Sequence, residues 1–116
     1  MKTEDKIGEI IQQLVLIDKN IERLEYMGEG ATQPEMLGAY HQQKHEEREK
    51  RRQLRAELLV LKQMHRAELA DRKTAIEAEM DLPGSNAWDV EEMREMIRNI
   101  DRKIEIISEE IKQLAQ

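Results

Sequence analysis

Two histidines are the residues of this sequence whose spacing comes nearest to a catalytic or metal-binding motif. His41 and His45 are four residues apart, and Glu49 continues the same row. Residues four apart lie on one face of a helix, where two imidazoles can chelate zinc. The zinc-protease motif places a glutamate directly after the first histidine, and this chain has Gln42 there. We therefore interpret the row as a solvated polar face, with zinc binding as the alternative, and assign no catalytic, cofactor or metal residue.

A second candidate site is the basic stretch of residues 44–55. Residues 34–55 hold six basic and four acidic side chains, whereas the whole chain has a net charge of −6. Clustered cations can contact phosphates, but here glutamates are interleaved and no aromatic residue stands by to stack on bases. Nucleic-acid binding is therefore the alternative function, and a solvated or protein-binding face is preferred. The arginines that share one side of a helix are Arg48, Arg51, Arg52 and Arg55.

A third candidate is an apolar repeat near the start of the chain. Between residues 3 and 28, aliphatic side chains recur at alternating steps of three and four, which is the heptad spacing of a coiled coil. Ile11, Val15, Leu16 and Met27 widen this stripe, and residues 14–17 are apolar right across the helix. Such a helix is expected to contact more than one neighbour. The repeat, named here the N-terminal seam, comprises Ile7, Ile10, Leu14, Ile17, Ile21 and Leu24.

Three helices are predicted to position these residues, over 3–28, 33–82 and 86–115. Thr32, Pro34 and Glu35 form the start signal of the second helix, and Pro83 stops it. The third helix is expected to open at Ser85 or Asn86. The pattern predicts an all-α fold, an elongated three-helix coiled coil with an antiparallel helical hairpin, built on one long central helix within a single domain, 1–116.

The third helix has a regular seam of its own and is expected to fold back along the second. In that arrangement Ile100 would lie near Leu69, and Trp88 would close the apolar end of the hairpin. His65 occupies a position on the apolar stripe of the second helix, where a polar residue can set the register.

The first helix presents a conflict. Folded back along the second, its seam would face residues 41–53, which include no aliphatic residue, and Ile17 would lie near His45. Aliphatic side chains left against water forfeit about 1.5–3 kcal/mol each. The sequence therefore predicts that the N-terminal seam finds its partner in another chain, as a homodimer or with a different protein, and a domain-swapped arrangement stays open.

Composition narrows the class of protein. Charged residues make up 38% and aromatic residues 3%, which is typical of a coiled coil. The chain has no cysteine, its first residues lack the apolar run of a signal peptide, and no stretch approaches ~20 apolar residues, so we expect a cytoplasmic protein with no membrane span. These features predict a non-enzymatic coiled-coil interaction protein, an adaptor, scaffold or inhibitor that acts through self-association and protein-partner binding.

Overall fold

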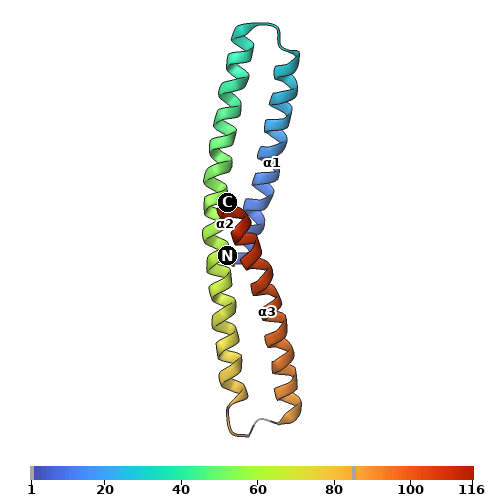
Figure 1. The fold of residues 1–116 in the computed structure, drawn as a ribbon, viewed down its shortest axis with the longest axis vertical. Coiled ribbons are helices and arrows are strands. Elements are labelled where there is room, and N and C mark those ends of the chain that lie inside the picture. The colour runs from blue at the N-terminus through green and yellow to red at the C-terminus, as the bar shows by residue number, and fades with distance from the viewer. Residues whose placement is uncertain (1, 85) are drawn as a thin grey trace. The chain divides into compact units, whose positions relative to one another are not determined.

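The fold consists of three α-helices (Figure 1). The computed structural model describes residues 2–84 and 86–116, and none of these residues is in a strand. The helices are α1 (Thr3–Gly30), α2 (Pro34–Met80) and α3 (Ala87–Ala115). The all-α prediction is confirmed, and the expected long central helix is the 47-residue α2, which continues without a break through the polar stretch.

The helix ends follow local sequence signals, with small shifts from the predicted bounds. α1 continues through Gly28 to Gly30, and α2 ends at Met80, two residues before the predicted stop. The φ of Gly84 is +94°, a conformation that glycine adopts without strain. The Asn86 side chain caps α3 by accepting a hydrogen bond from the Asp89 amide at 2.9 Å, whereas Ser85, the other predicted start, lies outside the described residues.

The chain divides into two compact units, Met1–Leu58 and Leu59–Gln116, and α2 contributes to both. In the C-terminal unit, α3 runs antiparallel to the second part of α2 (Figure 1). An ion pair of 2.8 Å joins Lys73 of α2 to Asp101 of α3, so Ile100 lies at the level of Lys73, one turn from the expected Leu69. The buried core of this unit consists of Leu69, Ile76, Ile100, Ile107 and Ile111.

In the N-terminal unit, α1 runs antiparallel to the first part of α2 (Figure 1). Two ion pairs define their register, Glu25 with Arg48 at 3.5 Å and Asp18 with Arg51 at 3.2 Å. Ile17 therefore lies opposite the turn that begins at Arg51. This is about two helical turns further along α2 than the expected position near His45.

Candidate interaction surface

The N-terminal seam is largely covered within the chain itself. Ile10, Ile17, Ile21 and Leu24 are buried, and Ile7 and Leu14 are half-buried. The expectation that the polar part of α2 has nothing to cover these side chains is therefore wrong. Self-association through this helix stays a prediction, but its contact residues have to be sought outside the buried seam.

Charged side chains of α2 provide the missing cover. Lys44, Glu47 and Arg51 are half-buried, and only 18% of the Glu47 side chain is exposed. Long charged side chains can lay their methylene groups on an apolar surface while the charged ends stay in water. These three residues continue one heptad row that begins and ends with apolar side chains: Leu37, Tyr40, Lys44, Glu47, Arg51, Leu54 and Leu58. Tyr40 and Leu54 are two heptads apart, and this spacing was the sequence signal that the row continues through the polar stretch.

Apolar side chains remain exposed on both flanks of the N-terminal seam. Ile11 and Val15 each follow a seam residue directly, and 43% and 48% of their surfaces are exposed. Leu16 precedes the seam residue Ile17 and is 60% exposed. Because positions before and after the seam lie on opposite sides of the α1–α2 contact, the unit has two distinct faces, each with exposed aliphatic surface.

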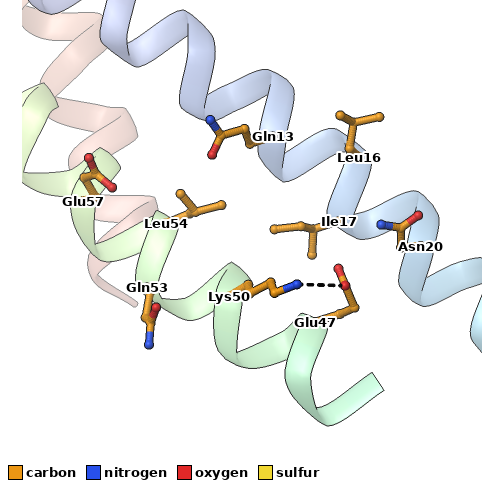
Figure 2. A pocket seen from close by; sticks show the side chains of 9 residues that line it. All are labelled: Gln13, Leu16, Ile17, Asn20, Glu47, Lys50, Gln53, Leu54 and Glu57. Carbon is orange, nitrogen blue, oxygen red and sulfur yellow. Dashed lines mark hydrogen bonds and ion pairs between the residues drawn. The ribbon is translucent and has the colours of Figure 1, made fainter. Parts of the chain in front are cut away.

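The face that carries Leu16 contains a groove of about 460 Å³ between α1 and α2. Ile17 and Leu54 point toward each other at its floor, and Lys50 donates to Glu47 across 3.5 Å at one end (Figure 2). The other lining side chains are polar or charged, except Leu16. They are Gln13, Asn20, Gln53 and Glu57.

The opposite face of the N-terminal unit has one acidic and one basic edge. The α1 residues that come directly after a seam residue form one row, which includes Ile11, Val15, Asp18, Glu22 and Glu25. The α2 residues that come directly after a member of its heptad row form the matching row, which includes His41, His45, Arg48, Arg52 and Arg55. The ion pair of Glu25 with Arg48 joins the two rows, which places them on the same side of the unit. We name this surface the charged face.

The basic stretch identified in the sequence is mostly paired with carboxylates. Arg48 and Arg51 bind Glu25 and Asp18 of α1, and Arg52 binds Glu49 of its own helix at 2.6 Å. Arg55 is exposed and makes no ion pair with the residues that the structure describes. The structure thus places the four arginines on one side of α2, but three of them already have an anionic neighbour.

A hollow of about 520 Å³ lies at the connection between α1 and α2. Tyr26 and Tyr40 line it together with two methionines, Met27 and Met36. Tyr26 is among the most exposed large side chains of the chain. Their positions in the sequence do not indicate a group, because these residues come together only when α1 and α2 pair.

In the C-terminal unit, several charged groups make contacts between α2 and α3. The buried Lys62 Nζ donates to Glu110, Arg66 donates to the Ser108 hydroxyl at 3.3 Å, and the Asp101 carboxylate raises the pKa of Lys73 by a hydrogen bond. Within α3, the hydrogen bond from Arg98 lowers the pKa of Glu95. The contacts of Lys62, Arg66 and Lys73 tie α3 to α2.

The three histidines and Trp88 differ in how far their side chains are exposed to solvent. His41 and His45 are exposed, and His65 is half-buried on α2. Among residues 2–84 and 86–116, no group of three or more histidine, aspartate or glutamate side chains is arranged to hold a metal ion.

Trp88 is 75% exposed, so the expectation that it closes the apolar end of the hairpin is wrong. The connection before α3 leaves it outside the row of buried isoleucines.

The architecture defines a class of protein, an all-α chain of two antiparallel helix pairs that share one long helix. No known protein family matches the chain, and no curated protein or solved structure matches it either. Across the described residues, none of the helices has both the length and the apolar character needed to cross a membrane.

Proposed function

We propose that this chain is a non-enzymatic coiled-coil interaction protein, an adaptor, scaffold or inhibitor that works by self-association and by binding a protein partner through α1. The proposal includes a cytoplasmic location, which the cysteine-free composition supports. The observation that carries it is the exposed aliphatic surface of α1. Ile11, Val15 and Leu16 remain exposed although the seam between them is already covered by α2.

α1 has more apolar surface than its pairing with α2 requires. A helix that pairs with a single neighbour needs only a narrow apolar seam, and α1 has that seam buried. About half of the surface of the side chains beyond it is left exposed in the N-terminal unit, and burying an aliphatic side chain fully contributes about 1.5–3 kcal/mol. A further helix packed on either flank would realise this free energy.

The test is a double substitution on α1, Val15→Glu with Leu16→Glu, and a matched control on α2, Val60→Glu with Met64→Glu. All four side chains are exposed, so both variants should keep the helical circular dichroism of the parent. We expect the α1 variant to weaken self-association at least about tenfold, since ~1.4 kcal/mol is a factor of ten. We expect the control to associate as the parent does.

Light scattering at tens of micromolar and affinity capture with each variant provide the measurements. A parent chain that stays a 13.7 kDa monomer, and that captures the same proteins as the α1 variant, would contradict the proposal. Loss of association in the α1 variant alone would support it.

A further inference from the structure

The charged face of the N-terminal unit has a property that the groove on the opposite side lacks. Its two edges carry opposite signs along the same length of the hairpin. The α1 edge has three carboxylates in succession, Asp18, Glu22 and Glu25, and the α2 edge has three guanidinium groups, Arg48, Arg52 and Arg55. Their ion pairs within the chain satisfy this surface only in part. Glu22 and Arg55 make no ion pair in the part of the chain that the structure describes.

The ion pair that joins the two edges of this face is itself open to solvent. Glu25 and Arg48 are 3.5 Å apart, and about half of each side chain is exposed. Arg52 turns toward Glu49 on its own helix instead of toward α1, and 79% of its side chain is exposed. Both edges can therefore accept additional partners without breaking the contacts that hold α1 against α2.

We propose that the charged face binds the same face of a second copy of this chain, with α1 of each copy lying over α2 of the other. This inference rests on the proposed function and names its partner. Charge complementarity between the two copies supports this contact. A two-fold axis parallel to the hairpin exchanges α1 and α2 without shifting them along their length, so the acidic edge of each copy meets the arginine edge of the other.

The other simple two-fold arrangement is less favourable. A two-fold axis that lies parallel to this face and runs across the length of the hairpin would stack α2 on α2. The arginine rows would then oppose each other, and like charges across an interface repel. A polyanion such as nucleic acid would satisfy the arginine edge but would meet three carboxylates beside it. A helix of one charge sign would satisfy only one edge, whereas a second copy satisfies both.

The expected association is modest and depends on salt. Exposed ion pairs are individually weak, and the adjoining Ile11 and Val15 contribute the apolar part of the contact. Raising the ionic strength should weaken the dimer, because exposed charges are screened within about 10 Å at 0.1 M salt and within about 3 Å at 1 M.

Charge reversal on the two edges provides the test. Glu22→Lys reverses the acidic edge and Arg52→Glu reverses the basic edge, and neither residue has an ion pair between α1 and α2 to lose. Each variant alone should dimerise at least about tenfold more weakly than the parent, because the reversal replaces attraction by repulsion at two symmetry-related contacts of the dimer. An equimolar mixture of the two should recover a heterodimer with an affinity within about threefold of the parent.

The recovery follows from the geometry of the proposed contact. In the mixed dimer each reversed acid lies over a reversed base, and each original glutamate lies over an original arginine. Glu105→Lys and Arg102→Glu, both on exposed positions of α3, are the matched controls and should leave dimerisation unchanged. The measurement is analytical ultracentrifugation of each variant and of the mixture, at low and at high salt.

The outcomes separate this inference from the proposed function. If the parent dimerises, and neither reversal weakens it or the mixture fails to recover, the charged face is not the contact and the inference is overturned. The proposed function then still stands, provided that Val15→Glu with Leu16→Glu abolishes association. A monomeric parent overturns the inference, and the capture comparison then decides the proposed function separately.

Discussion

At the scale of single residues, the informative side chains are those with a long aliphatic stem and a charged end. Glu47 and Arg51 stand where a coiled coil would place leucine, and they are half-buried against the N-terminal seam. Each contributes methylene contact while its charge stays hydrated or paired. This explains how a helix segment with no aliphatic residue can contribute to covering the buried side chains of the seam, together with Leu54 next to it.

The first prediction distinguishes a buried seam residue from its exposed neighbour. Ile17→Ala should lower the free energy of unfolding by about 2–5 kcal/mol, since it removes buried methyl groups and leaves a cavity. Leu16→Ala, at an exposed position, should change it by no more than about 0.5 kcal/mol. Urea denaturation followed by circular dichroism measures both. Equal effects of the two substitutions would show that Ile17 is not packed between α1 and α2.

At the scale of helices, each pair is held by an apolar row with ion pairs at its edges. In the C-terminal unit this row is aliphatic on both helices, and Lys73 of α2 reaches Asp101 of α3 beside it. The hydrogen bond with Asp101 raises the pKa of Lys73 above the ordinary 10.5. A raised pKa in the folded state means that the protonated lysine contributes to stability.

The second prediction concerns this pair at high pH. The contribution of Lys73 should be fully present below pH 10.5 and should be lost as the pH rises through the higher folded-state pKa. Lys73→Met should remove that loss, so the stability difference between parent and variant should shrink as the pH rises above 10.5 through the folded-state pKa. Thermal denaturation across this range is the measurement. A constant difference would show that the ion pair does not respond to the lysine charge.

At the scale of the whole molecule, the charge distribution bears on the choice of partner. The chain has a net charge of −6, and three of the four arginines of the basic stretch have carboxylate neighbours in the structure. An acidic protein with paired arginines should repel phosphate backbones more than it attracts them.

The third prediction follows from this charge balance. At physiological salt, binding to duplex DNA or RNA should be no tighter than the ~10⁻⁴–10⁻⁶ M of non-specific contacts. Fluorescence anisotropy with labelled duplexes measures this. Tighter, salt-sensitive binding that disappears when Arg48, Arg51, Arg52 and Arg55 are replaced would establish the alternative function and overturn the prediction.

Much of this fold could be read from local signals. Heptad spacing, the Pro34 start and the Pro83-Gly84 stop predicted three helices, because helix formation depends on residues a few positions apart. The pairing of α3 with the second part of α2 was also predictable, since both segments have an aliphatic row and a short connection joins them.

The environment of α1 was decided only by the tertiary structure. The register between α1 and α2 differs from the sequence-based expectation by about two turns, and it sets Ile17 beside Leu54 and Glu47 instead of beside His45. Whether Glu47 is a solvated charge or a cover for an isoleucine depends on which residue lies opposite. The sequence alone therefore determined which side chains of α1 are apolar. The packing of α2 determined that the seam is buried while Ile11, Val15 and Leu16 remain exposed. The physical reason is that cross-helix register depends on contacts between residues distant in the chain.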